Sequence, residues 1–214
     1  MEPQDPGTTA ARAYDQLADD YARLLPDTRA EQPLELAMIG AFTSVVPEPQ
    51  RVLDAGCGTG RMIAELSARG SQVTGCDISP GMVEHARRVH PELTIEVAPL
   101  ADLPFGDAAF DGVLLWYSMI HTPLSQWGPA VAEVLRVLTP GGALLIGFQE
   151  GEGEKDLSAF YRDLGHHVTL SRWRHTLDEV AAAWPGTTEL ARLRRAPVGN
   201  EPDPQAFLLL RKDS

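Results

Sequence analysis

Cysteine is scarce in this sequence, with only Cys57 and Cys76 among 214 residues. Two cysteines cannot build a disulfide framework, and their spacing matches no metal-binding pattern. We therefore expect both thiols to be reduced and structural. The same scarcity predicts a cytoplasmic protein without a metal centre.

Long apolar runs are also missing. No stretch is long and apolar enough to cross a bilayer. Residues 1–15 contain acidic side chains and no apolar core, which argues against a secretory signal. The sequence thus predicts a soluble chain with no membrane contact.

Basic residues are outnumbered. The chain has 18 Lys and Arg against 30 Asp and Glu, which gives a formal net charge of −12 and a pI of about 4.8. Such a protein is repelled by phosphate backbones and by anionic lipid headgroups. We therefore expect no nucleic-acid partner and favour a small-molecule substrate. The basic residues Arg192, Arg194 and Arg195 are interpreted as solvated charges at a strand or helix edge.

The rest of the composition is that of a globular protein, with 43% hydrophobic and 22% charged residues. The length fits one domain spanning residues 1–214. Periodicity and turn residues predict the following elements. Helices are expected at 10–25, 33–46, 61–69, 80–89, 123–138, 157–164 and 177–184, and strands at 51–55, 72–77, 93–97, 110–117, 143–148, 190–195 and 205–211.

Strands and helices alternate from residue 51 onward. This alternation predicts an α/β fold with a mostly parallel sheet and helices on both faces. The last two strands are expected to form an antiparallel pair. In such sheets ligands bind beyond the carboxyl ends of the strands, so function should lie in the loops that follow them.

The sharpest local signal is a glycine-rich turn after the first expected strand, Asp54-Ala55-Gly56-Cys57-Gly58-Thr59-Gly60. Its glycines allow positive φ angles and close approach of a ligand to the backbone, and the next helix begins with unpaired N–H groups. A phosphate-binding P-loop would end in Gly-Lys-Ser/Thr, whereas Arg61 follows here. In the nicotinamide dinucleotide pattern GxGxxG the third glycine comes one residue later. A tight turn without a ligand is the remaining alternative.

Asp77 ends the second expected strand, about 20 residues after the first glycine. A carboxylate there can accept hydrogen bonds from both hydroxyls of a ribose. A dinucleotide enzyme would use the same acid, and a simple turn at the strand end would also explain it.

These two segments resemble the cofactor motifs of the class I, Rossmann-like methyltransferases that depend on S-adenosylmethionine (SAM). Residues 103–105 (Leu-Pro-Phe), 110–113 (Phe-Asp-Gly-Val) and 139–142 (Thr-Pro-Gly-Gly) resemble later segments of the same family in the same order. The resemblance extends from about Tyr14 to Arg211. It implies a doubly wound, seven-stranded, mostly parallel sheet with an antiparallel last strand. It also implies that residues 10–46 form a helical lid over a core of residues 51–211.

The resemblance assigns roles to the cofactor residues. Asp54 would contact the amino group of the methionine moiety, and Asp77 would hold the ribose. Many members place an acid against the adenine amino group, but the matching position here is Pro99. Either Asp102 replaces that acid, or backbone groups of Leu100 and Ala101 hold the adenine, which we favour. The remaining cofactor residues implied by the resemblance are Gly56, Gly58, Ile78 and Met82.

Residues 14–21 resemble the opening segment YDxxAxxY of many small-molecule methyltransferases. By that resemblance Tyr14 or Tyr21 would contact the methionine end of SAM, and the N-terminal helices would close over it. Ordinary contacts of an amphipathic helix are the alternative.

Methyl transfer is an in-line displacement from an activated donor. Positioning and exclusion of water can therefore supply much of the catalysis, and a base is needed only for a protonated acceptor. The acceptor pocket is expected beyond the strand that ends near Tyr117. His121 is the candidate base or substrate-orienting group, because a free histidine has a pKa near neutrality. A histidine that only contacts cofactor or caps a helix is the alternative.

His166 and His167 follow Gly165 in a region that the family tends to place over the active site. They are candidates for acceptor contacts, with exposed loop histidines as the alternative.

The sequence thus predicts a cytoplasmic SAM-dependent methyltransferase, of the EC 2.1.1 type. The acceptor would be an O, N or C atom of a small molecule such as a natural product, and the protein a monomer or homodimer. Two alternatives stay open. One is an NAD-dependent oxidoreductase, against which the early third glycine and the Pro140-Gly141-Gly142 segment argue. The other is a non-catalytic SAM-binding module.

Overall fold

The fold is built on one large sheet, seen in a computed structural model that describes residues 6–214. Residues 1–5, on which part of the argument against a secretory signal depends, lie outside the described residues. The seven strands lie in the order β3-β2-β1-β4-β5-β9-β8. Their bounds are β1 Arg51–Ala55, β2 Gln72–Asp77, β3 Ile95–Val97, β4 Phe110–Trp116, β5 Leu138–Gln149, β8 Thr187–Arg195 and β9 Gln205–Lys212.

The direction of the strands confirms the predicted fold class. The first five strands are mutually parallel, and β9 runs antiparallel to both of its neighbours, β5 and β8. The chain leaves β3 at one edge and returns beside β1 as β4, so the strand order reverses between β1 and β4. Ligands bind at such a switch point in doubly wound sheets.

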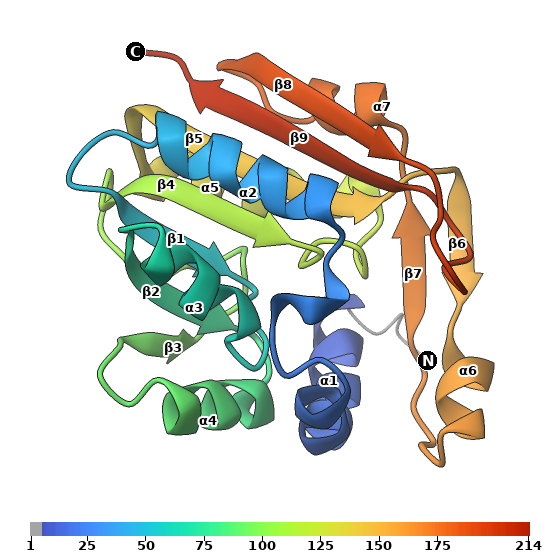
Figure 1. Cartoon of the computed structure of the whole chain (residues 1–214). Helices are drawn as coiled ribbons and strands as arrows, with labels where there is room; N and C mark the ends of the chain where they lie inside the picture. The colour runs from blue at the N-terminus through green and yellow to red at the C-terminus, as the bar shows by residue number, and fades with distance from the viewer. Residues whose placement is uncertain (1–5) are drawn as a thin grey trace.

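Helices cover both faces of this sheet (Figure 1). The helices α2 (Pro33–Val45), α3 (Arg61–Ala68) and α4 (Pro80–Val89) bury apolar side chains on one face. The helices α5 (Gly128–Val137) and α7 (Leu177–Ala182) do so on the other. Two apolar cores, one on each side, therefore hold the strands and fix where their ends lie.

The structure divides the predicted lid of residues 10–46 into two parts with different positions. Helix α2 lies directly on the sheet, where Phe42 and Val46 fill the space above Gly112. Helix α1 (Pro6–Leu24) instead packs against α4 and against the segment that precedes β7. Helix α1 and the 3-10 turn that follows it, Thr28–Ala30, both line the cavity described below, to which α2 contributes Glu35 alone.

A second, two-stranded sheet was not predicted. Strands β6 (Gly153–Asp156) and β7 (Ser171–Arg174) pair antiparallel, with helix α6 (Ser158–Asp163) between them. We call β6 and β7 the flap. Both strands are short and polar, so no apolar alternation marks them in the sequence.

The Pro140-Gly141-Gly142 segment does not precede its strand, as the sequence predicted, but lies inside it. Strand β5 begins at Leu138, directly after α5, and its pairing with β4 jumps from Phe110–Leu138 to Gly112–Ala143. The extra residues form a bulge in which Gly141 has a φ of 75°, a conformation that glycine adopts readily.

The described residues contain neither a membrane-spanning helix nor a metal-binding cluster. None of their helices is long and apolar enough to span a membrane. None of their histidine, cysteine and acidic side chains gathers into a group of three or more that could hold a metal ion.

Candidate active site

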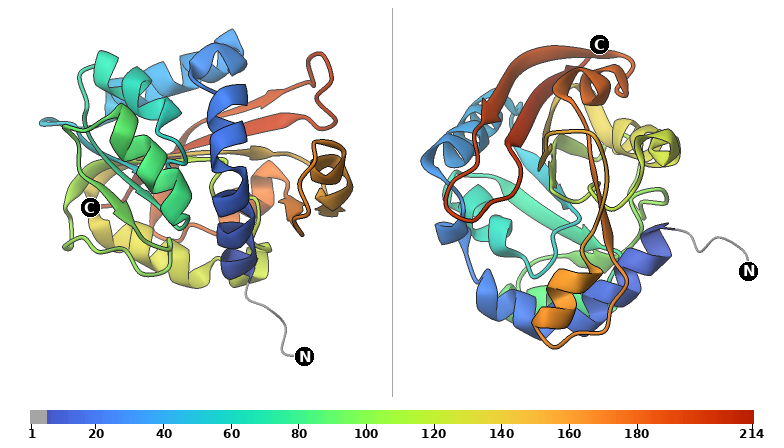
Figure 2. Two further views of the ribbon diagram at one scale, coloured as in Figure 1. Left: turned by 90° about the horizontal axis from the view of Figure 1, so that it is seen from below. Right: turned by 90° about the vertical axis from the view of Figure 1, so that its right-hand side faces the viewer.

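A cavity of about 860 Å³ lies beyond the carboxyl ends of β1, β2, β4 and β5. The right-hand view of Figure 2 looks toward this edge of the sheet and shows α1, α6 and the loop between β8 and β9 around it. Ligand pockets commonly measure about 300–1,000 Å³. The cavity is thus at the large end of that range, with room for a nucleotide cofactor and a second small molecule.

The glycine turn after β1 forms the floor of this cavity. Gly56, Gly58 and Gly60 have φ angles of 80°, 55° and 85°. A Cβ atom on Gly56 would lie 2.2 Å from the Cβ atom of Ser118, so only glycine lets the ends of β1 and β4 approach this closely. A Cβ atom on Gly58 would meet only Tyr21, at 3.9 Å. Gly58 lines the cavity, so its missing side chain leaves room for a ligand.

Asp54 is a buried carboxylate that lacks a partner. Its residue is 1% exposed, and neither carboxylate oxygen has a hydrogen-bond partner among the described residues. Burial raises the pKa of Asp54 to about 7, and the nearby charge of Asp77 adds to the rise. An unpaired buried carboxylate is costly. Asp54 does not itself line the cavity, whereas Gly56, two residues further on, does. The site therefore fits a donor such as the ammonium group of the methionine moiety, bound directly or through water.

Asp77 lies beside the glycine turn, and its carboxylate can accept more hydrogen bonds than it does. One carboxylate oxygen accepts the N–H of Gly58 at 2.8 Å and the other accepts the N–H of Ser79 at 2.9 Å. Asp77 also lines the cavity, and burial raises its pKa. Each oxygen has further lone pairs, so the geometry suits the two hydroxyls of a ribose.

The predicted adenine residues lie together next to Asp77. Ile78, Met82, Leu100 and Ala101 all line the cavity, as does Pro99. Asp102 is exposed and is not among the residues that line it. The substitution of Asp102 for the missing acid is therefore not supported, and backbone groups of residues 100 and 101 remain in position.

His121 and Tyr14 form a hydrogen-bonded pair that lines the cavity. His121 Nδ1 lies 2.6 Å from the carbonyl oxygen of Ser171, so Nδ1 must carry the proton. Its Nε2 then accepts the hydroxyl of Tyr14 at 2.7 Å. Burial lowers the pKa of His121 to about 4, with the Arg172 charge adding to the fall. Burial raises the pKa of Tyr14 well above its usual value. Both groups are therefore neutral at neutral pH.

The other candidate residues divide between the cavity and the surface. Tyr21 and Tyr117 line the cavity. His166 and His167 do not line it. The His166 ring instead lies 2.6 Å from the Asp20 carboxylate on α1, and His167 is exposed. The segment after α6 packs against α1 through Val168 and Leu170, and neither histidine is part of the predicted acceptor site.

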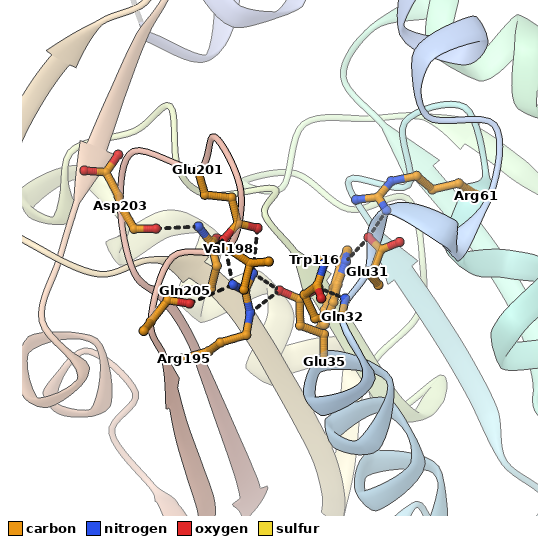
Figure 3. Close-up of polar contacts among 11 residues, drawn as sticks. Glu31, Gln32, Glu35, Arg61, Trp116, Arg195, Val198, Glu201, Asp203 and Gln205 are labelled. Atoms are coloured by element: carbon orange, nitrogen blue, oxygen red, sulfur yellow. Dashed lines mark hydrogen bonds and ion pairs between the residues drawn. The ribbon is translucent and has the colours of Figure 1, made fainter.

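A network of charged side chains also reaches the cavity (Figure 3). It includes Arg195, which the sequence analysis wrongly interpreted as solvated and which is 6% exposed. Arg195, at the end of β8, contacts Glu35 on α2 at 2.5 Å and Glu201 in the β8–β9 loop at 2.6 Å. Arg61 pairs with Glu31, which also accepts the indole N–H of Trp116 at 3.2 Å. Since Arg195 and Glu35 are 160 residues apart, no local pattern could have signalled this network.

Known proteins resemble the chain in sequence and fold. Residues 52–142 match the family model of a methyltransferase domain. The demethylmenaquinone methyltransferase of Beutenbergia cavernae is 39% identical over 139 residues, which cover 64% of this chain and 53% of the relative. The malonyl-[acyl-carrier protein] O-methyltransferase of Erwinia pyrifoliae is 34% identical over 164 residues, covering 77% of this chain and 57% of the relative.

A solved structure with the same fold is a 1,6-didemethyltoxoflavin-N1-methyltransferase of Burkholderia thailandensis, with 1,6-didemethyltoxoflavin and S-adenosylhomocysteine bound. The TM-score is 0.72 at 23% identity, over 100% of this chain and 93% of that chain. This likeness concerns the fold. The chain spans about half the length of the curated relatives it matches.

Proposed function

Because the chain belongs to the Rossmann-like, SAM-dependent methyltransferases, we propose that it transfers the methyl group of SAM to a small molecule bound in the cavity. The observation that carries this proposal is the pairing of two sites in one space. A glycine cradle lines this space, and the partnerless buried carboxylate of Asp54 lies two residues before its first glycine. A buried Tyr14–His121 pair lines the same cavity.

The cofactor end would bind SAM through Asp54, Asp77 and the glycine turn. Asp54 would accept from the ammonium group and Asp77 from the ribose hydroxyls, while Ile78 and Met82 would enclose the adenine. When bound, SAM supplies a methyl group already activated by the positive charge on its sulfur.

Tyr14, which the resemblance assigned to the methionine end of SAM, would in this proposal face the acceptor, and His121 would position Tyr14. The hydroxyl proton of Tyr14 is committed to His121 Nε2. The phenol oxygen can therefore only accept a hydrogen bond from the cavity, which would orient an O–H or N–H group of the acceptor. Since the pKa of His121 is about 4, a positioning role suits it better than that of a base that must hold a proton at neutral pH.

The acceptor itself does not follow from the relatives. Their names give demethylmenaquinone, malonyl-[acyl-carrier protein] and 1,6-didemethyltoxoflavin, which differ in kind. The oxygen, nitrogen or carbon nature of the acceptor atom, a natural-product role, a cytoplasmic location and a monomer or homodimer are therefore parts of the proposal. The Tyr14–His121 pair in the cavity favours a catalyst over a non-catalytic SAM-binding module.

Calorimetric titration with SAM, S-adenosylhomocysteine and NAD in parallel tests the proposal. Micromolar binding of the first two without binding of NAD supports it. An acceptor screen that follows the release of S-adenosylhomocysteine then compares the wild type with Tyr14→Phe. Absence of binding by both SAM and S-adenosylhomocysteine would overturn the proposal.

A further inference from the structure

The flap carries three cations on one of its faces. Lys155 on β6 pairs directly with Arg172 on β7, and Arg174 lies two residues further along β7. Directly paired residues share a face of a sheet, and alternate residues of a strand return to it. The acidic residues of β6, Glu154 and Asp156, point to the opposite face by the same alternation.

A single buried carboxylate forms ion pairs with these three cations. Asp203, in the β8–β9 loop, is 4% exposed. It pairs with Arg172, with Arg174 at 3.1 Å and with Lys155 at 3.7 Å. Glu150 and Glu201, acids of the same region, are engaged by Arg194 and Arg195. The cluster of Lys155, Arg172, Arg174 and Asp203 therefore has two positive charges in excess.

The excess charge reaches the cavity through Arg172. Of the four residues in the cluster only Arg172 lines the cavity. Its side chain is 11% exposed, and its Nε is buried without a hydrogen-bond partner among the described residues. Arg172 follows Ser171, whose carbonyl oxygen holds His121. Tyr14, which bonds the same histidine, lines the same cavity as Arg172.

A buried guanidinium with an unused donor calls for an acceptor oxygen. Its planar fork of N–H donors matches the two oxygens of a carboxylate, or those of a phosphate. Asp203 already occupies part of the fork, but three cations share that one carboxylate. The whole protein has a net charge of −12, whereas this cluster produces a local positive potential where Arg172 reaches the cavity.

We propose that the methyl acceptor carries an anionic oxygen group, a carboxylate or a phosphate, and that Arg172 binds this group beside Tyr14. This inference rests on the proposed function, since it concerns the substrate of the same site. The methionine end of the cofactor would lie elsewhere, at Asp54 and Gly56. Arg61, already paired with Glu31, lines the cavity as well.

Binding of small probes to the protein saturated with S-adenosylhomocysteine tests this proposal. Benzoate, phenyl phosphate and benzamide have the same ring and differ in charge, and ligand-observed NMR titration measures each affinity. We expect benzoate or phenyl phosphate to bind at least about tenfold more tightly than benzamide, because a charge-assisted hydrogen bond is at stake. Whichever anion binds more tightly identifies a carboxylate or a phosphate as the group.

Three variants assign the preference to its residue. Arg172→Gln keeps a hydrogen-bond donor for Asp203, which retains Arg174 and Lys155 as partners, so we expect it to fold and to lose the preference for anions. Arg172→Lys should restore part of it. Arg194→Gln is the matched control, because Arg194 is exposed, pairs with Glu150 and does not line the cavity. It should keep the full preference.

Two outcomes would overturn this inference but not the proposed function. Benzamide could bind as tightly as the anions, or Arg172→Gln could lose its affinity for S-adenosylhomocysteine. In the second case Arg172 would hold the carboxylate of the cofactor. A wild-type protein that binds no S-adenosylhomocysteine would instead overturn the proposed function, and this inference with it.

Discussion

At the scale of single residues, burial decides what the polar groups of the cavity can do. Asp54 has a pKa of about 7 because it is buried without a partner, so roughly half of the molecules carry its proton at neutral pH. An ammonium group at this site would lower the pKa again. We therefore expect binding of S-adenosylhomocysteine to release roughly half a proton from Asp54 at about pH 7, more at lower and less at higher pH.

Calorimetry in buffers of different ionisation enthalpy measures this release. Asp54→Asn, which keeps the shape of the side chain, is the control. The difference between the two proteins in the number of protons released is the contribution of Asp54. An equal proton count in both would contradict the role of Asp54 at the ammonium group.

Asp77 leads to a second prediction at this scale. Its carboxylate braces the backbone at Gly58 and Ser79 and faces the cavity. We expect Asp77→Ala to weaken SAM binding by about a hundredfold or more, since two hydrogen bonds to a charged group would be lost. The fold should stay intact, as judged by circular dichroism. Unchanged affinity by calorimetry would remove Asp77 from the ribose site.

The pH dependence of catalysis tests the role of His121. Burial lowers its pKa to about 4, so the ring is neutral above that pH and accepts the Tyr14 hydroxyl. We expect kcat/KM to show no inflection from His121 between about pH 5.5 and 8, and to fall only near the lower pKa. An inflection near pH 6.5 that disappears in His121→Gln would show instead that His121 is an ordinary base.

At the scale of elements, the contact between α2 and β4 explains why α2 is not part of a lid. A Cβ atom on Gly112 would lie 2.8 Å from Val46 and 2.9 Å from Phe42. Gly112→Ala should therefore lower the free energy of unfolding by about 1–3 kcal/mol through overpacking, measured by urea denaturation. Gly106→Ala is the control, since a Cβ atom there meets nothing within 4 Å. Equal stability of the two variants would contradict this role for α2.

The elements also show what could be predicted from the sequence. The strands at 51–55 and 72–77 were predicted with their observed bounds. The apolar segment of the first ends at Gly56, and that of the second ends at Asp77. The flap was not predicted, because it is stabilised by cross-strand pairing and by Asp203 rather than by apolar alternation. The bulge at Gly141 was taken for a turn, because proline and glycine favour both conformations.

At the scale of the whole molecule, the location of the site could be predicted from the sequence, whereas many contacts between its residues could not. The order of strands fixes the cavity at the carboxyl edge, and the two sharpest cofactor motifs come from the ends of β1 and β2. The proposed acceptor site combines α1, the flap and the loop after β4. Its key contacts join residues such as Tyr14 and His121, which are 107 positions apart. Such contacts depend on the tertiary fold, so no local pattern contains them.

The position of α1 over the cavity is a property of the whole molecule. Polar contacts join the helix to its surroundings: Asp15 accepts from Ser79 Oγ at 2.6 Å and from the Gly81 N–H at 3.0 Å, Tyr14 bonds His121, and Asp20 lies 2.6 Å from His166. A helix at the surface opens locally before the central strands do, and a ligand that contacts it favours the closed state. We expect S-adenosylhomocysteine to slow amide hydrogen exchange in α1 while leaving β4 and β5, buried in the central sheet, unchanged.

Asp15→Ala separates this closure from the contacts of the cofactor itself. Asp15 is not among the residues that line the cavity, so its removal takes away no direct contact with the cofactor, and Ser79 keeps its backbone N–H for Asp77. Exchange in α1 should become faster in the free protein, and S-adenosylhomocysteine should bind more weakly by the cost of closing the helix. If α1 were instead a fixed wall, the variant would exchange and bind like the wild type.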